Sequence, residues 1–178
     1  MSKASGGTRN YNGTPSYSKR KDEFGSLMSS GDYKEGYISK SGGFYVIHNK
    51  HNEINHKNDD YSNVAAKKLA KKGYKVYLDS EENFMLETPI ADGRVYKRKA
   101  DFKTVSTVGS NTIKGAIEKA SKQGAEVAVL YQRTKKMDRT YVEKQLDLFR
   151  LKSPKKAREK IKEVIVVGLS GNVHRHKM

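Results

Sequence analysis

The segment Ala125–Tyr131 constrains the fold more than any other part of this sequence. It reads AEVAVLY, an almost unbroken apolar run with β-branched residues, which is typical of a central strand buried on both faces of a sheet. Val164–Leu169 is a second run of the same character. Because both faces of such strands must be removed from water, the two runs predict a sheet with helices packed on it.

The spacing of apolar residues predicts where the other elements lie. Helices are expected at residues 61–72, between Asn111 and Gly124, at 137–151, and in a short basic segment after Ser153-Pro154. Further strands are expected at 44–47, 74–78, 83–87 and 94–104, the last opened by the turn signal Asp92-Gly93. The predicted order is β-αβββαβ-αα-β. This order corresponds to an α+β fold with a single mixed β-sheet packed by helices.

The two ends of the chain differ in composition from the middle. Residues 1–42 are rich in Gly, Ser and Tyr and show no apolar period, so they predict a flexible basic arm. The α+β domain is then expected to span residues 43–173, and residues 174–178 form a basic tail.

Charge indicates the kind of partner. The chain has 36 Lys and Arg against 20 Asp and Glu, a formal net charge of +16. Residues 132–178 hold fourteen basic and five acidic residues and so carry +9 of this total. A field of this sign favours a polyanion, most commonly nucleic acid. We expect Lys155, Lys156 and Lys160 of the short basic helix to contact it; lysines that only keep a small protein soluble are the alternative.

Several classes of protein are excluded. The chain has no Cys, so it contains no disulfide, zinc knuckle or thiol nucleophile. No apolar run approaches the roughly 18 residues of a membrane-spanning helix, and the polar N-terminus has no apolar core of a secretory signal. The expected location is the cytoplasm. The alternative is a protein that is delivered, or associated with a virion, without a signal peptide.

The segment from Thr88 to Lys103 is the best candidate for chemistry. As one continuous strand it would alternate, with one face made of Arg94, Tyr96, Arg98, Ala100 and Phe102 and the other of Val95, Lys97, Lys99, Asp101 and Lys103. Asp101 and Lys103 would then project together, with Asp92 entering from the preceding turn. Lys97 and Lys99 would guide a phosphodiester along the same face. A solvated basic strand with one ordinary ion pair is the alternative.

The first polar loop gathers four further acid/base or ligand candidates: His48, His51, Glu53 and His56. Without a metal, a His and a Glu can act as general base and acid when a 2′-hydroxyl attacks its phosphate. The group His51, Glu53 and His56 could instead ligate zinc, although loop ligands lack the fixed spacing of a helical motif. The third possibility is that the loop is simply polar and solvated.

Two families resemble this pattern. The order αβββαβ, with Asp92 before the third strand and Asp101-x-Lys103 on it, resembles the PD-(D/E)xK nuclease core. Here Ile90-Ala91 separates Pro89 from Asp92, so the literal Pro-Asp pair is absent. That resemblance implies a metal-dependent DNase, with Mg²⁺ as its cofactor.

A closer resemblance covers about residues 43–170. It is to the C-terminal tRNase domains of CdiA contact-dependent toxins and their relatives in phage head-morphogenesis proteins, within the barnase/EndoU/colicin/RelE-like group of metal-independent RNases. The residues that carry it are Glu53, Ala66, Leu69, Ala70, Gly73, Tyr74, Val76, Pro89, Asp92, Gly93, Asp101, Phe102, Lys103, Ile113, Ile117, Gln123 and Val127–Leu130.

The resemblance implies a toxin-type nuclease, and specifically a metal-independent RNase that cleaves tRNA-like substrates without a cofactor. It implies Glu53, Asp92, Asp101 and Lys103 as catalytic residues and RNA rather than DNA as partner. From the first loop we add His51 as a catalytic acid/base candidate. An immunity protein, or a parent toxin or phage assembly, would be the protein partner. A catalytically silent nucleic-acid-binding or virion-associated protein on the same scaffold is the competing hypothesis, and the Mg²⁺-dependent DNase is the third.

Overall fold

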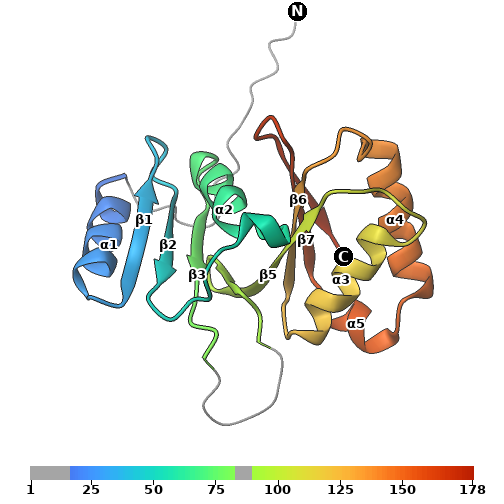
Figure 1. Ribbon diagram of the computed structural model, residues 1–178, viewed down its shortest axis with the longest axis horizontal. Helices are drawn as coiled ribbons and strands as arrows, with labels where there is room; N and C mark the ends of the chain where they lie inside the picture. The colour runs from blue at the N-terminus through green and yellow to red at the C-terminus, as the bar shows by residue number, and fades with distance from the viewer. Residues whose placement is uncertain (1–16, 83–89) are drawn as a thin grey trace, which may run out of the picture.

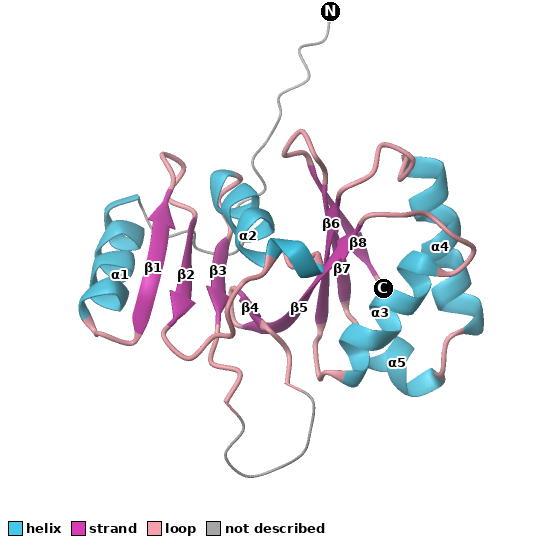
Figure 2. Ribbon diagram, in the orientation of Figure 1, coloured by secondary structure: helices cyan, strands magenta, loops and turns pink. Residues whose placement is uncertain are grey.

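The structure is a computed structural model that describes residues 17–82 and 90–178. In these residues eight strands form one mixed sheet whose spatial order is the sequence order (Figure 2). The strands are β1 (Tyr33–Ile38), β2 (Phe44–His48), β3 (Lys75–Leu78), β4 (Gly93–Val95), β5 (Arg98–Val105), β6 (Val127–Gln132), β7 (Glu163–Val167) and β8 (Val173–Lys177).

Helices connect each parallel pair of strands. The helix α2 (Ser62–Lys71) joins β2 to β3, α3 (Thr112–Lys122) joins β5 to β6, and α4 (Arg139–Lys152) with α5 (Lys155–Lys160) joins β6 to β7. The other neighbouring strands are antiparallel. The predicted fold class, an α+β fold with a mixed sheet packed by helices, is therefore confirmed.

The two faces of the sheet bury different cores. One face, here called the α2 face, packs Tyr45, Val76 and Val129 with Leu69 of α2. Side chains alternate along a strand, so the neighbours of these residues lie on the opposite face. That opposite face is covered by α1 (Tyr17–Ser29) at the β1 end and by α3, α4 and α5 at the other end (Figure 1). The stretch of β4 and β5 between these two groups of helices carries the candidate site.

The expectation that residues 17–42 form a flexible arm is wrong, because they contain α1 and the edge strand β1. Phe24 of α1 packs against Phe44 with their ring centroids 5.7 Å apart. Arg20 is buried and donates a hydrogen bond of 2.7 Å to the carbonyl oxygen of Gly73. A few aromatic and charged anchors, rather than an apolar period, hold this helix, which is why the sequence pattern did not indicate it. Residues 1–16 of the expected arm lie outside the described residues.

The expected basic tail is also part of the sheet, because β8 pairs with β7 along its whole length, from Val173 to Lys177. The strand expected at 83–87 lies outside the described residues.

The single strand expected at 94–104 is in fact a hairpin. β4 ends at Val95 and β5 begins at Arg98, and Tyr96 adopts a positive φ of 56° in the turn between them. Gly93 is not the turn residue but a point of close approach, since a Cβ there would lie 1.9 Å from the carbonyl oxygen of Tyr77. The reversal brings Val95 onto the α2 face with Ala100 and moves Arg94 to the opposite face.

Candidate active site

Asp101 is the centre of the candidate site. It lies on β5 and is completely buried, on the face opposite α2. Its neighbours Ala100 and Phe102 belong to the core on the α2 face. Lys103, two residues further along the strand, places its Nζ 2.7 Å from Oδ2 of Asp101. The structure therefore brings together the carboxylate and the ammonium that the Asp-x-Lys spacing predicts.

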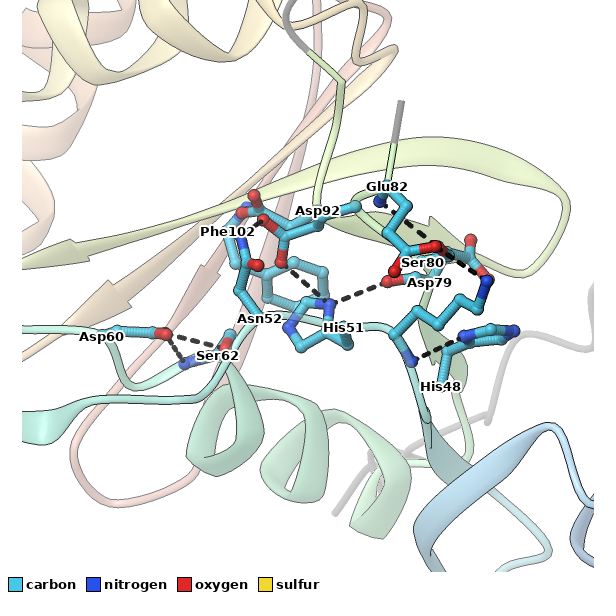
Figure 3. Close-up of polar contacts among 12 residues, drawn as sticks. His48, His51, Asn52, Asp60, Ser62, Asp79, Ser80, Glu82, Asp92 and Phe102 are labelled. Carbon is cyan, nitrogen blue, oxygen red and sulfur yellow. Dashed lines mark hydrogen bonds and ion pairs between the residues drawn. The ribbon is translucent and has the colours of Figure 1, made fainter. Parts of the chain in front are cut away.

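Asp92 supplies a second carboxylate from the residue before β4. Its Oδ2 accepts a hydrogen bond of 2.9 Å from the backbone N–H of Phe102 (Figure 3). This bond holds Asp92 next to Asp101. Burial, and after it the nearby Asp92 carboxylate, raise the pKa of Asp101 to about 7, although Lys103 opposes both effects. Asp101 is thus a carboxyl group that exchanges its proton near neutral pH.

Lys103 is held from two sides. Besides its ion pair with Asp101, its Nζ donates a hydrogen bond of 2.8 Å to Oε1 of Gln123, at the C-terminal end of α3. One quarter of the Lys103 side chain remains exposed, so the ammonium can be reached from solvent. In the sequence, Gln123 is indicated only by the family resemblance; the structure gives it a physical role.

A metal ion would find two carboxylates here. Both oxygens of Asp101 are buried, and Oδ2 is ion-paired with Lys103, so Oδ1 is the suitable acceptor for a cation. Mg²⁺ typically uses one or two carboxylates and completes its shell with water and substrate phosphate, and Asp92 and Asp101 fit that pattern. Within residues 17–82 and 90–178, no three His, Asp or Glu side chains gather closely enough to form a full protein cage.

The loop candidates separate in the structure. The ring of His51 is buried, and its Nδ1 lies 2.8 Å from the carbonyl oxygen of Asp79 (Figure 3). The same Nδ1 lies 3.0 Å from Oε1 of Glu81. The N–H of Asp79 in turn donates to the carbonyl oxygen of Asp92 at 3.1 Å, so His51 braces the strand end beside the site. Among the described residues, its ring makes no contact with Asp101.

Glu53 and His56 do not join His51. Glu53 is exposed, and His56 stacks on Tyr61 and lies 3.3 Å from Oδ1 of Asn63. The three proposed zinc ligands of this loop are therefore not gathered around one point, and the zinc hypothesis is not supported by the geometry.

The expected nucleic-acid lysines lie at different distances from the site. Lys97 is exposed in the β4–β5 turn, and Lys99 is exposed on the face of Asp101, opposite Arg94 in the hairpin. Lys155 and Lys156 are exposed on α5.

Lys160 approaches the site most closely from α5. Its Nζ lies 3.9 Å from the position that a Cβ on Gly124 would occupy, and Gly124 follows the Gln123 that holds Lys103. Lys160 therefore extends the basic surface toward the candidate site.

Arg94 is a site residue that the sequence pattern missed. Its guanidinium makes two hydrogen bonds to Asp79, of 2.6 and 2.8 Å, and lies over the ring of Tyr77, 4.3 Å from its centroid. These bonds to Asp79 raise the pKa of Arg94. A single strand would have pointed Arg94 into the core. In such a strand the apolar residues Val95 and Ala100, five positions apart, would lie on opposite faces. This mismatch was the sequence signal that the strand is interrupted between them.

Comparison with known proteins shows which family the part of the chain around the site resembles. Residues 90–173 match the family model described as the contact-dependent growth inhibition CdiA C-terminal domain. This part of the chain is similar to the CdiA C-terminal domain. The resemblance seen in the sequence is thus confirmed for the part of the chain that holds Asp92, Asp101, Lys103 and Gln123, and this family supports a toxin function.

A solved structure shows the same fold. It is a chain of a CdiA-CT/CdiI toxin and immunity complex from Burkholderia pseudomallei, with a TM-score of 0.53 and 20% sequence identity. The similarity covers 74% of this chain and 98% of that chain. No curated protein matches the sequence. None of the helices in the described part of the chain has the length and apolar character needed to cross a membrane.

Proposed function

We propose that this chain is a toxin nuclease of the CdiA C-terminal type, which cleaves phosphodiester bonds of RNA at Asp92, Asp101 and Lys103. The observation that carries the proposal is the buried Asp101 carboxyl, placed beside a second carboxylate and ion-paired to a lysine that solvent can reach. Pairs of titratable groups with strongly shifted pKa values concentrate at catalytic sites.

Each group has a chemical role in this proposal. Asp101, with a pKa of about 7, is suited to take the proton of an attacking 2′-hydroxyl near neutral pH. Lys103 neutralises the charge that develops on the phosphate, and Gln123 holds the ammonium in place. His51 positions the strand end that carries Asp92. The exposed Glu53 has no contact that links it to this centre among the described residues, so its part as acid or base rests on the sequence alone.

A metal-dependent nuclease is the second candidate, and it is favoured by the buried Oδ1 of Asp101, which has no hydrogen-bond partner among the described residues. Asp92 and Asp101 would hold a divalent cation such as Mg²⁺, which when bound activates water and stabilises charge on the phosphate. Lys103 would keep its role at the phosphate, and Asp101 would be ionised because the cation favours the charged form.

One cleavage assay separates the candidates. The wild-type chain is incubated with tRNA and with a DNA duplex, each in EDTA and in Mg²⁺, beside Asp101→Asn and Lys103→Gln. The matched control is Lys40→Gln, which removes an exposed lysine from the turn between β1 and β2. If wild type and Lys40→Gln cleave tRNA in EDTA and the two site variants do not, the RNase is supported.

The other outcomes of the assay are equally specific. Cleavage that needs Mg²⁺ supports the metal-dependent candidate. If both nucleic acids bind but neither is cut under any condition, the nuclease proposal fails and a silent nucleic-acid-binding protein takes its place.

The expected protein partner is an immunity protein. The similar Burkholderia chain was solved as a toxin and immunity complex. By analogy we propose that a cognate immunity protein binds this chain and that the toxin acts after delivery into another cell. Co-expression with the neighbouring open reading frame, followed by co-purification and a growth assay, tests this directly.

A further inference from the structure

Three side chains form a layered stack on the surface beside α2. The rings of His56 and Tyr61 are parallel to within 4°, with centroids 4.4 Å apart. The guanidinium carbon of Arg133 lies 4.0 Å from the centroid of the same Tyr61 ring. One face of a tyrosine ring has room for only one planar group at such a distance. His56 and Arg133 therefore lie on opposite faces of Tyr61.

The core holds this stack in position. Tyr61 precedes α2 and lies 6.1 Å from the buried Tyr131 of β6, ring centroid to ring centroid. Arg133 directly follows β6, and its N–H donates a hydrogen bond of 2.8 Å to the carbonyl oxygen of Val105. His56 belongs to the short 3₁₀ helix His56–Asn58, and its Nε2 lies 3.3 Å from Oδ1 of Asn63. The rings are thus ordered before any ligand binds.

The side chain of His56 is accessible to a ligand. His56 is exposed, and within the described part of the chain its ring stacks on Tyr61 alone and has a polar contact with Asn63 alone. The ring face turned away from Tyr61 is therefore the one that a ligand can reach. The nearby exposed charges are mixed, with Lys57 and Arg133 set against Glu53 and Asp59. A ligand of this surface is therefore selected by a flat π-face rather than by charge. An unpaired nucleobase is such a ligand, since bases stack on exposed rings in a way that tolerates any sequence.

We propose that His56 is the outer layer of a base-stacking platform, backed by Tyr61 and Arg133, that takes one unpaired base of RNA. This inference rests on the proposed function, because it assigns part of the substrate recognition of the same nuclease. Tyr61 and Tyr131 belong to the core on the α2 face, whereas Asp101 lies on the opposite face. The platform therefore holds a nucleotide other than the one that is cleaved and selects RNA with single-stranded segments.

The test measures binding without cleavage. In an Asp101→Asn background, affinities are measured for an RNA hairpin with an unpaired 2-aminopurine in its loop and for a fully paired duplex with the same number of phosphates. His56→Ala should weaken hairpin binding roughly 5- to 100-fold, the usual loss per stacked base. Duplex affinity should not change, and the salt dependence of hairpin binding should keep its slope because every phosphate contact is retained.

Two variants serve as controls. His56→Phe keeps a ring and should retain hairpin binding, and His174→Ala removes an exposed histidine from β8 and should change nothing. The fluorescence of 2-aminopurine, which stacking quenches, should fall on binding to the parent and to His56→Phe.

Each of four results would contradict the stacking platform. Two concern affinity: His56→Ala binds the hairpin as tightly as its parent, or it loses affinity equally for hairpin and duplex. The other two are that the parent does not quench 2-aminopurine, or that it binds neither RNA. The nuclease proposal fails separately, if the chain with Asp101 intact cuts neither RNA nor DNA while stacking is observed.

Discussion

The backbone N–H of Phe102 donates a hydrogen bond to the side chain of Asp92, and this bond holds the second carboxylate beside Asp101. The two acidic residues lie nine positions apart in the sequence and are brought together by the hairpin of β4 and β5. Their closeness, together with burial, moves the pKa of Asp101 into the neutral range. Both the activity and the stability of the protein should therefore depend on pH near neutrality.

The first prediction concerns the pH profile. Asp92→Asn keeps an acceptor for the N–H of Phe102 but removes the negative charge of Asp92. In the wild type, that negative charge raises the pKa of Asp101. The pKa of Asp101 should therefore fall, and the acidic limb of the pH–rate profile should move to lower pH. The measurement is initial cleavage rate from pH 4 to 9. An acidic limb that stays in place would show that Asp101 is not the group that titrates.

The second prediction concerns stability. The pKa of Asp101 rises from 3.8 to about 7 on folding, so the folded state binds the proton more tightly than the unfolded state. The stability this proton contributes is present below pH 4 and is lost as pH rises to about 7, with a magnitude of up to about 4 kcal/mol. Asp101→Asn should remove that part of the pH dependence. Urea unfolding of both proteins between pH 4 and 8 measures it, and parallel pH curves would contradict it.

The third prediction concerns the lysine of the site. Lys103→Gln should lower kcat by roughly 10²- to 10³-fold, because one electrostatic donor to the developing phosphate charge is removed. The fold should persist, since the Lys103 side chain is partly exposed and its removal leaves no large cavity. Lys40→Gln, in the exposed turn between β1 and β2, is the matched control for the loss of one positive charge. Equal activity of Lys103→Gln and wild type would reduce the Asp101–Lys103 pair to an ordinary ion pair.

The fourth prediction concerns the N-terminal segment. Deletion of residues 1–42 should lower the melting temperature sharply, because it exposes Phe44 and leaves the carbonyl of Gly73 without its Arg20 donor. Arg20→Ala alone should cost about 1–3 kcal/mol in free energy of unfolding. Deletion of residues 1–16 is the comparison, since it leaves α1 and β1 in place. A deletion of 1–42 that melts like the full chain would mean that α1 is dispensable.

The fifth prediction concerns the basic helix α5. Changing Lys155, Lys156 and Lys160 to Gln should flatten the salt dependence of RNA binding, by about 0.7 in log–log slope for each phosphate of a single strand that a lysine no longer neutralises. The slope is obtained from the binding of labelled RNA between roughly 50 and 300 mM salt, because the Debye length changes strongly over these concentrations. An unchanged slope would place the interface elsewhere.

Local patterns in the sequence determined most of the architecture. The apolar runs at Val127–Leu130 and Val164–Val167 became central strands, and the helical spacing of Val142, Leu146 and Phe149 became the buried side of α4. The placement of Asp101 and Lys103 on one face followed from the two-residue period of a strand. Such features depend on neighbours within a few positions, so they can be predicted from local sequence patterns.

Tertiary structure alone decided the rest. The approach of Asp92 to Asp101 depends on the turn at Tyr96, and the bond from Lys103 to Gln123 depends on how α3 crosses back to β6. Docking of α1 and the stack of His56 on Tyr61 likewise join segments through packing. Contacts of this kind are set by strand register, turn geometry and burial across the whole sheet. No period in the sequence encodes them, because their energy arises only when distant segments are brought together.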